Sequence, residues 1–126
     1  MLSAKKKKSN KVIIFLVFWI FGVLVHQRLA LDQEIIKNVG VSFGLTGQMW
    51  VGLSVILLLI IGIYWWKKDY WGISLVMVGG LINLADRIIW GYVRDYWRLG
   101  LVYNNIADWI IQIGFIIFLL ELWKKK

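Results

Sequence analysis

Two carboxylates stand within hydrophobic stretches, where ionisable groups are rare. Asp86 lies near the end of the apolar stretch 71–90, and Asp108 lies near the start of the apolar stretch 106–123. A charge inside a membrane span costs at least about 2.5–3.5 kcal/mol near the helix centre and less towards the interface. If the two stretches are neighbouring helices, the two carboxyl groups lie at a similar depth and can share a proton. Such a pair can hydrolyse a peptide bond, because one carboxylate takes a proton from water while the other donates one to the scissile carbonyl.

Other polar residues accompany the first carboxylate at helical spacing. Asn83, Asp86 and Arg87 share one stripe of a helix, because residues three and four apart lie on the same face. Gly79 continues this stripe by one turn. A glycine at such a position predicts that another helix approaches closely.

The second carboxylate belongs to a similar stripe. Asn105, Asp108 and Gln112 follow one another at helical spacing. A structural interpretation remains open for both stripes. Asp86 and Arg87 can form an ion pair, Asp108 can be a charge favoured by the helix dipole, and the amides can be hydrogen-bonding links between helices.

The elements that must position these residues are long hydrophobic segments. The chain has 126 residues, of which 60% are hydrophobic, and it contains neither proline nor cysteine. A bilayer core of about 30 Å needs about 20 apolar helical residues to cross it. The segments that meet this requirement are about 12–31, 49–66, 71–90 and 106–123. We therefore predict an all-α integral membrane protein in which residues 1–126 form one domain with four transmembrane helices.

The first segment also has the basic start and apolar middle of a secretory signal peptide. The residues that follow it are His26, Gln27 and Arg28, which do not form a small-residue cleavage site. We therefore expect this segment to be a retained span.

The basic residues predict the orientation. Four spans place both termini on one side, and that side carries ten of the fifteen basic residues: Lys5–Lys8, Lys11, Lys67, Lys68 and Lys124–Lys126. The positive-inside rule places this side in the cytoplasm, so segments 27–46 and 91–105 face outward. A net charge of +8 is compatible with a protein that binds nucleic acid. A nucleic-acid partner is not expected, because these lysines flank spans rather than form one contiguous face.

Four short motifs occur in order along the chain. They are Asn38-Val39-Gly40-Val41-Ser42-Phe43, Asn83-Leu84-Ala85-Asp86-Arg87, Gly91-Tyr92-Val93-Arg94-Asp95 and Asn105-Ile106-Ala107-Asp108. Their order, spacing and predicted side of the membrane resemble bacterial lipoprotein signal peptidase (signal peptidase II). The corresponding family motifs are N-x-G-x-A-F, N-x-x-D-R, G-x-V-x-D and F-N-x-A-D.

The resemblance implies a membrane-embedded aspartyl endopeptidase of the bacterial cytoplasmic membrane. Its substrates would be diacylglyceryl-modified prolipoproteins, cut before the lipidated cysteine. The resemblance implies that Asp86 and Asp108 are the catalytic pair. The residues to which it gives substrate-binding or supporting roles are Asn38, Gly40, Gly79, Asn83, Arg87, Asp95 and Asn105. It implies no metal or other cofactor, and it implies a monomer with membrane lipids as further partners.

Asp95 has two further interpretations. It can pair with one of the nearby arginines, which are Arg87, Arg94 and Arg98. It can also be a solvated loop charge, because exposed pairs contribute little to stability.

The chain departs from the family pattern near the outer end of the first span. Where the family has an aspartate and, four residues later, a lysine, this chain has His26 and Ala30. A lone histidine is more often a snorkelling or hydrogen-bonded side chain than a catalyst. Asn104 and Trp109 also replace family residues, and the outward segment 27–37 is only eleven residues long. We therefore predict a shortened family member.

Two other functions fit parts of the sequence. A small four-helix proton-coupled transporter has a similar length and uses a membrane-embedded carboxylate. Such proteins tend to carry an acid deep in the first span, where this chain has none, and their binding sites lie near the bilayer midplane. The second alternative is a homologue that binds lipidated peptides without cutting them, because loss of supporting residues weakens a site.

Overall fold

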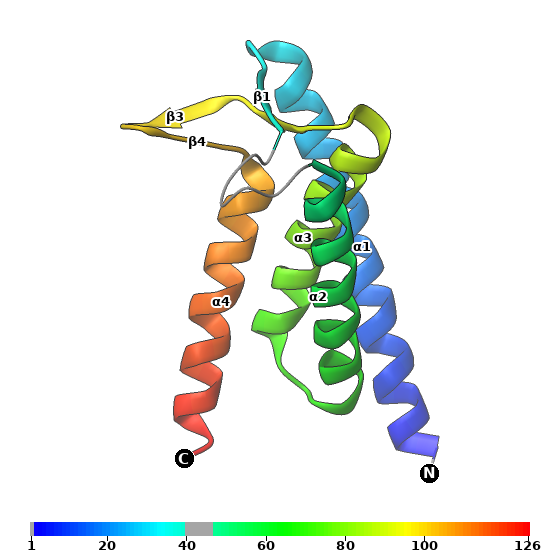
Figure 1. Cartoon of the computed structure of the whole chain (residues 1–126). Coiled ribbons are helices and arrows are strands. Elements are labelled where there is room, and N and C mark those ends of the chain that lie inside the picture. Colours follow the sequence, from blue (N-terminus) through cyan, green and yellow to red (C-terminus); the bar gives the residue numbers. More distant parts are fainter. Residues whose placement is uncertain (1, 40–46) are drawn as a thin grey trace.

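The computed structural model describes residues 2–39 and 47–126. In these residues the helices are α1 (Leu2–Asp32), α2 (Gly47–Lys67), α3 (Trp71–Trp90) and α4 (Ile106–Lys124). The strands are β1 (Ile36–Asn38), β2 (Val93–Asp95), β3 (Trp97–Leu99) and β4 (Val102–Asn104). Each of the four helices is long and apolar enough to cross a membrane, as predicted. Both chain termini lie at the same end of the molecule (Figure 1).

The helix boundaries agree closely with the predicted spans, except at the start of α1. This helix begins at Leu2 rather than Val12. The segment in between is rich in lysine, which is a good helix former, so the helix continues beyond the apolar stretch.

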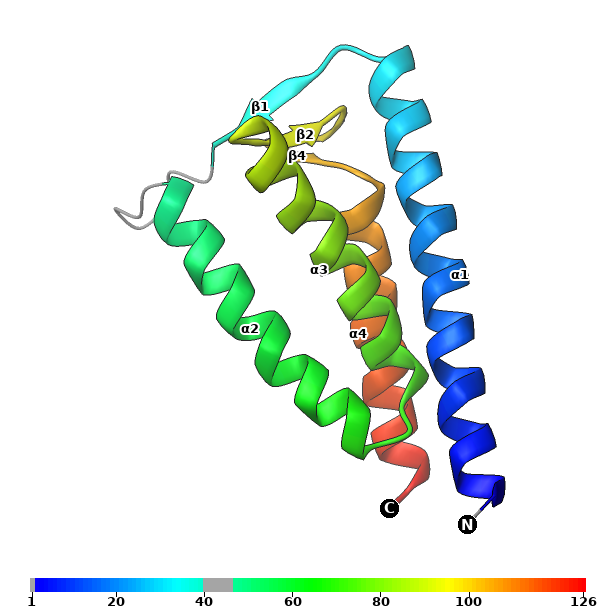
Figure 2. The ribbon, with the colours of Figure 1, turned by 90° about the vertical axis from the view of Figure 1, so that its right-hand side faces the viewer.

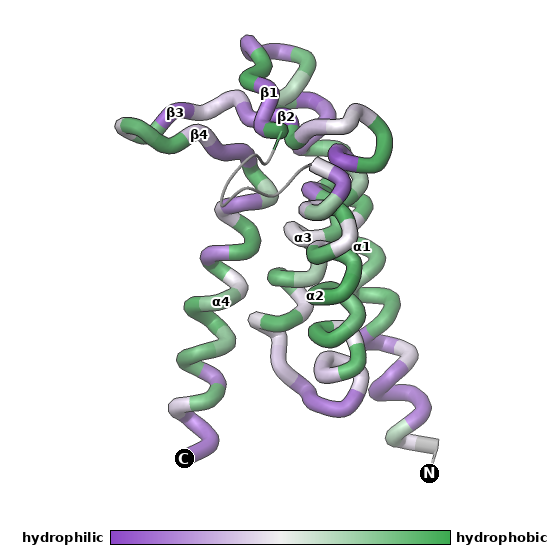
Figure 3. The backbone as a smooth tube through the Cα atoms, in the orientation of Figure 1, coloured by the Kyte–Doolittle hydropathy of each residue, from purple (hydrophilic) through white to green (hydrophobic). Residues whose placement is uncertain are grey.

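The pattern of burial is the reverse of that in a water-soluble bundle. Large apolar side chains along the helices are exposed, among them Phe21 at 66% and Leu59 at 63%. The buried side chains include polar ones such as Asp86 and Asn105. Figure 3 shows hydrophobic residues along the middle of the helices and hydrophilic ones towards their ends. This distribution suits a bundle whose outer surface contacts lipid.

α3 is the central helix of the bundle. It packs most extensively against α4 and also contacts α2 and α1, which lie on opposite sides of it (Figure 2). Glycines bring the backbones of α3 and α4 close together. A Cβ atom on Gly79 would lie 2.5 Å from the carbonyl oxygen of Ala107, and one on Gly72 would lie 2.4 Å from that of Gly114. The close helix approach that the sequence predicts at Gly79 is therefore present.

Two small antiparallel sheets, which are not predicted from the sequence, lie at the end of the bundle opposite the termini. β1 pairs with β2 (Figure 2), and β3 pairs with β4 (Figure 1). The strands contain three residues each, which is too short for an alternating pattern to be recognised. The first pairing sets Asn38 opposite Val93, and Ile36 opposite Asp95. Residues 36–38, which follow α1, are thereby paired with residues 93–95, which follow α3.

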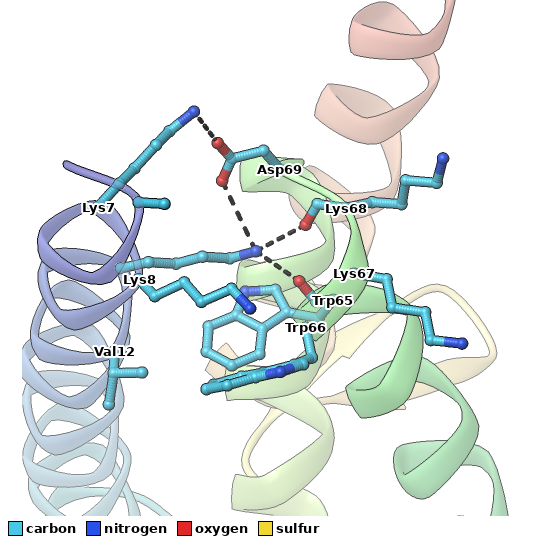
Figure 4. A pocket seen from close by; sticks show the side chains of 10 residues that line it. Lys7, Lys8, Val12, Trp65, Trp66, Lys67, Lys68 and Asp69 are labelled. Carbon is cyan, nitrogen blue, oxygen red and sulfur yellow. Dashed lines mark hydrogen bonds and ion pairs between the residues drawn. The ribbon is translucent and has the colours of Figure 1, made fainter. Parts of the chain in front are cut away.

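Lysines of α1 form hydrogen bonds and an ion pair at the end of the bundle where the chain termini lie. Lys11 donates hydrogen bonds from Nζ to the carbonyl oxygens of Trp65 and Lys68, at 2.5 and 2.6 Å, where α2 ends. Lys7 forms an ion pair with Asp69 in the turn between α2 and α3 (Figure 4). The hydrogen bond from Lys7 holds the pKa of Asp69 below its ordinary value. These contacts connect the start of α1 to the α2–α3 turn.

Candidate active site

The position of Asp108 follows from the way α4 begins. Asn105 is the N-cap residue of this helix, and its side-chain oxygen accepts a hydrogen bond of 3.1 Å from the backbone N–H of Asp108. In return, Oδ2 of Asp108 accepts a hydrogen bond of 3.0 Å from the backbone N–H of Asn105. This reciprocal pair is a capping box. It holds the Asp108 carboxylate at the positive end of the helix dipole.

Two asparagine side chains link Asp108 to a second carboxyl group. Asn83 of α3 donates from Nδ2 to Oδ1 of Asp108 at 2.9 Å. Asn105 donates from Nδ2 to Oδ1 of Asn83 and to Oδ1 of Asp95, each at 3.0 Å. The amides therefore connect helices, as the structural interpretation expected. They also place Asp95 and Asp108 in one hydrogen-bonded network.

Asp95 lies at the end of β2 and is completely buried, with 0% of its surface exposed. Burial raises the pKa of its carboxyl group above the ordinary value, and the charge of Asp108 acts in the same direction. Hydrogen bonds from Asn38, at 3.1 Å, and from Asn105 act in the opposite direction, as does the positive charge of Arg87. Asp95 is therefore not a solvated loop charge. It is a carboxyl group that retains its proton at a higher pH than an ordinary aspartate does.

Asp86 has different surroundings, although it too is buried. Arg94 donates hydrogen bonds to both carboxylate oxygens of Asp86. Its Nη2 donates to Oδ1 at 2.8 Å, and its backbone N–H donates to Oδ2 at 3.0 Å. Nε2 of His26 lies 2.9 Å from Oδ2. A carboxylate held by a guanidinium group in this way is stabilised in its charged form. Both oxygens of Asp86 are therefore engaged in a structural ion pair, and the arginine is Arg94 rather than the adjacent Arg87 that the sequence suggested.

Asp108, the predicted catalytic partner of Asp86, is hydrogen-bonded to Asn83 and Asn105 instead. Among the described residues, no hydrogen bond joins the carboxylates of Asp86 and Asp108, whereas Asn105 alone contacts both Asp95 and Asp108. Arg87 is half-buried near this network, and its buried Nε atom has no hydrogen-bond partner in the described part of the chain. Gly40, which the resemblance also placed in the site, lies outside the described residues.

His26 and Tyr96 complete the buried cluster, and the sequence analysis gave neither of them a role in the site. His26 is 1% exposed, and its Nδ1 lies 3.1 Å from the hydroxyl oxygen of Tyr96. That oxygen accepts a hydrogen bond of 3.0 Å from the backbone N–H of Ile106. Burial raises the pKa of Tyr96 to about 12, so its hydroxyl stays protonated. His26 is therefore a hydrogen-bonded buried side chain, as expected for a lone histidine.

Chemically, the site offers two carboxyl groups in unequal surroundings. Asp108 is half-buried and accepts hydrogen bonds from the Asn83 side chain and from the backbone N–H of Asn105. Asp95 is more deeply buried, and its raised pKa favours its protonated form. Two carboxyl groups that differ in this way can divide the roles of general base and general acid.

The chain is similar to known proteins over most of its length. The model of a family described as signal peptidase (SPase) II matches residues 6–124 of the chain. A lipoprotein signal peptidase of Thermodesulfovibrio yellowstonii is 35% identical over 106 residues, which cover 75% of this chain and 72% of the relative. One from Halothermothrix orenii is 29% identical over 136 residues, covering 91% of this chain and 93% of the relative.

Solved structures show the same fold. A bacterial membrane enzyme superimposes with a TM-score of 0.71 at 24% sequence identity, over 90% of this chain and 89% of that enzyme. A second bacterial membrane enzyme structure gives a TM-score of 0.71 at 23% identity, over 90% of this chain and 94% of that one.

Proposed function

The chain belongs to the signal peptidase II family of membrane proteases, and from this premise we propose that it is an aspartyl endopeptidase whose catalytic pair is Asp95 and Asp108. Its function is the removal of signal peptides from lipoprotein precursors. The single observation that carries the proposed pair is the position of Asn105, which donates hydrogen bonds to both carboxylates.

This pair replaces the one that the sequence suggested, Asp86 with Asp108. An aspartyl peptidase needs one carboxyl group that holds a proton and one that is ionised. Asp86 cannot readily hold a proton, because Arg94 and His26 occupy both of its oxygens. Asp95 has a raised pKa, and its hydrogen-bond donors among the described residues are neutral amides, so it suits the protonated role.

In the proposed reaction, the ionised Asp108 accepts a proton from a water molecule as the water oxygen attacks the scissile carbonyl carbon. Asp95 donates its proton to the carbonyl oxygen, which gives a tetrahedral intermediate. When the carbon–nitrogen bond breaks, the leaving nitrogen receives a proton from Asp108. The carboxyl group of Asp95 then recovers its proton from the second hydroxyl group of the intermediate, and the pair is ready for another cycle.

The neighbouring residues support this pair in the same proposal. Asn83 and Asn105 hold the carboxylates at a fixed separation, and Asn38 covers Asp95 from β1. Arg87 brings a positive charge that offsets the one negative charge that the pair carries throughout the proposed reaction. Gly79 contributes indirectly, because it lets α3 and α4 approach. Gly40 keeps the supporting role that the resemblance implies.

The location of the site suits a lipid-modified substrate. The network lies where α3 ends and α4 begins, next to the paired strands β1 and β2 (Figure 2). We propose that this end faces outward from the bacterial cytoplasmic membrane, in accordance with the lysines at the opposite end. A diacylglyceryl group would remain in the bilayer while the bond to be cut reaches the interface. The monomeric state and the membrane lipids as partners belong to the same proposal.

The test is cleavage of a diacylglyceryl-modified prolipoprotein by the purified full-length protein in detergent. We expect the native protein to cut, and we expect Asp95→Asn and Asp108→Asn to bind the substrate without cutting it. Helicity and melting temperature of each variant serve as controls for folding. A native protein that binds the lipidated substrate but leaves it intact would overturn the enzymatic proposal in favour of a non-catalytic homologue.

A further inference from the structure

His26 in α1 is a buried titratable side chain that the proposed reaction does not use. It lies between the Asp86 carboxylate and the Tyr96 hydroxyl, at 2.9 and 3.1 Å. We propose that His26 is a positioning residue that fixes both backbone neighbours of Asp95 and the first residue of α4. The proposal rests on Asp95 and Asp108 being the catalytic pair.

The first connection runs through Asp86 to the residue before Asp95. His26 contacts Oδ2 of Asp86, and the same oxygen accepts the hydrogen bond from the backbone N–H of Arg94. The position of this oxygen therefore sets the position of the Arg94 backbone. Because Arg94 directly precedes Asp95, a shift of the Asp86 carboxylate is passed on to Asp95.

The second connection runs through Tyr96, which directly follows Asp95. The Tyr96 hydroxyl contacts Nδ1 of His26 and accepts the backbone N–H of Ile106. Ile106 is the first residue of α4 and lies two residues before Asp108. His26 is thus connected to the second carboxyl group of the pair as well as to the first.

The hydrogen-bond partners also assign the proton on the imidazole ring. An ionised carboxylate can only accept, so Nε2 of His26 carries the hydrogen that is donated to Asp86. In the neutral ring Nδ1 then accepts the hydroxyl hydrogen of Tyr96. The Tyr96 oxygen in turn accepts from Ile106, so each polar atom along this route has a partner. An apolar side chain at position 26 would remove one hydrogen-bond partner from Asp86 and one from Tyr96, both of which are buried.

His26 is not required to hold α1 in the bundle. Phe15, Trp19 and Val23 of α1 pack against a buried cluster of α3 and α4 residues. A substitution at position 26 therefore leaves α1 docked and loosens the segment around Asp95. This difference separates a positioning role from a purely structural one.

The experiment measures kcat and KM for cleavage of the lipidated prolipoprotein by the purified full-length protein. His26→Leu removes both polar contacts, whereas His26→Gln keeps a donor that can reach Asp86. We expect His26→Leu to lower kcat about 10- to 100-fold with little change in KM, because small misplacements of reacting groups have effects of that size. His26→Gln should recover a substantial part of the loss. Leu24→Val, at a position 63% exposed on the same helix, is the control and should behave like the native protein.

A double-mutant cycle supplies the second readout. Tyr96→Phe removes the hydroxyl group, and because it breaks the same route, its effect on kcat should be less than multiplicative with that of His26→Leu. Native kcat in folded His26→Leu, or fully multiplicative effects, would overturn the proposal. If His26→Leu does not fold, His26→Gln is compared with His26→Asn, whose shorter side chain cannot reach Asp86; equal kcat values would then overturn it.

The same assay separates this inference from the proposed function. Cleavage by Asp95→Asn at the native rate would rule out Asp95 as a member of the catalytic pair, whatever the effect of substituting His26. If Asp95→Asn is inactive and His26→Leu has the native kcat, the positioning role of His26 is ruled out and the catalytic pair stands.

Discussion

The side chain of Asn105 donates a hydrogen bond of 3.0 Å to the carboxylate of Asp95. The same residue caps α4 and binds Asp108 through its backbone N–H. One asparagine therefore determines both where the helix begins and how the two carboxyl groups are placed relative to each other.

This double role can be separated by substitution. Asn105→Ser keeps an oxygen that caps the helix but removes the amide that contacts Asp95. We expect kcat to fall in Asn105→Ser, while its melting temperature stays above that of Asn105→Ala. Asn105→Ala should lose both functions, with a loss of about 0.5–2 kcal/mol in the free energy of unfolding. Thermal unfolding and prolipoprotein cleavage measured on the same preparations test this, and full activity in Asn105→Ser would contradict it.

The pH dependence of cleavage should report on Asp95. Burial raises its pKa, and the protonated form is the proposed acid, so kcat should fall as the pH rises through that pKa. The hydrogen bond from Asn38 lowers the pKa of Asp95. Asn38→Leu removes this hydrogen bond, so we expect the basic limb of the pH–kcat profile to move to higher pH. A basic limb that moves to lower pH, or stays in place, would contradict the proposed role of Asp95.

The pKa of Asp95 also determines the direction of a stability effect. Its folded-state pKa is raised above the value in the unfolded chain. The protonated carboxyl group of Asp95 therefore contributes stability that is fully present below the unfolded pKa. This contribution is lost as the pH rises through the folded pKa. In Asp95→Asn, thermal unfolding should lack this part of the pH dependence.

Gly79 provides a test of the α3–α4 packing that carries the site. A Cβ atom there would meet the Ala107 backbone at 2.5 Å, so Gly79→Ala should force the helices apart. Overpacking of this kind costs about 1–3 kcal/mol. Gly52→Ala in α2 is a matched control, because a Cβ atom at Gly52 meets nothing within 4 Å. Thermal unfolding in detergent should show a lower melting temperature for Gly79→Ala only, and equal melting temperatures would show that the contact is unimportant.

Lys11 should matter for stability and not for catalysis. Its Nζ binds the carbonyl oxygens of Trp65 and Lys68 at the end of α2, which is the end of the bundle opposite the candidate active site. Hydrogen bonds that involve a charged group contribute about 1.5–3 kcal/mol, so Lys11→Met should lower the melting temperature. Lys6→Met, at an exposed position of the same helix, is the control. Cleavage per folded molecule should be unchanged in both variants, and a loss confined to kcat in Lys11→Met would be inconsistent with this assignment.

Much of the helical architecture could be predicted from the sequence, because long apolar segments are a local signal. The polar stripes around Asn83 and Asn105 were also recognisable from helical spacing, and the structure brings them together. The β1–β2 pairing was not predictable in this way. It joins residues separated by more than fifty positions in strands of three residues each.

The proposed reassignment of the catalytic carboxyl groups rests on contacts that local spacing does not show. Asp86 stood out because it lies within an apolar stretch, and Asp95 was inconspicuous because it lies in a loop. The contacts that distinguish them come from far along the chain: His26 reaches Asp86, and Asn38 reaches Asp95. Burial and long-range partners determine the protonation state of each carboxyl group, and neither can be read from local spacing.

The most direct test of the central claim compares single-turnover cleavage of the lipidated prolipoprotein by Asp95→Asn and Asp86→Asn, per folded molecule. We predict that Asp95→Asn binds substrate but cuts at least about 10²–10⁴-fold more slowly, the contribution of a general acid. Asp86→Asn should lower the melting temperature and retain cleavage well above that of Asp95→Asn, because its main task is to hold Arg94 and His26. Native-like cutting by Asp95→Asn, together with a folded and substrate-bound but inactive Asp86→Asn, would contradict the account and restore Asp86 as the partner of Asp108.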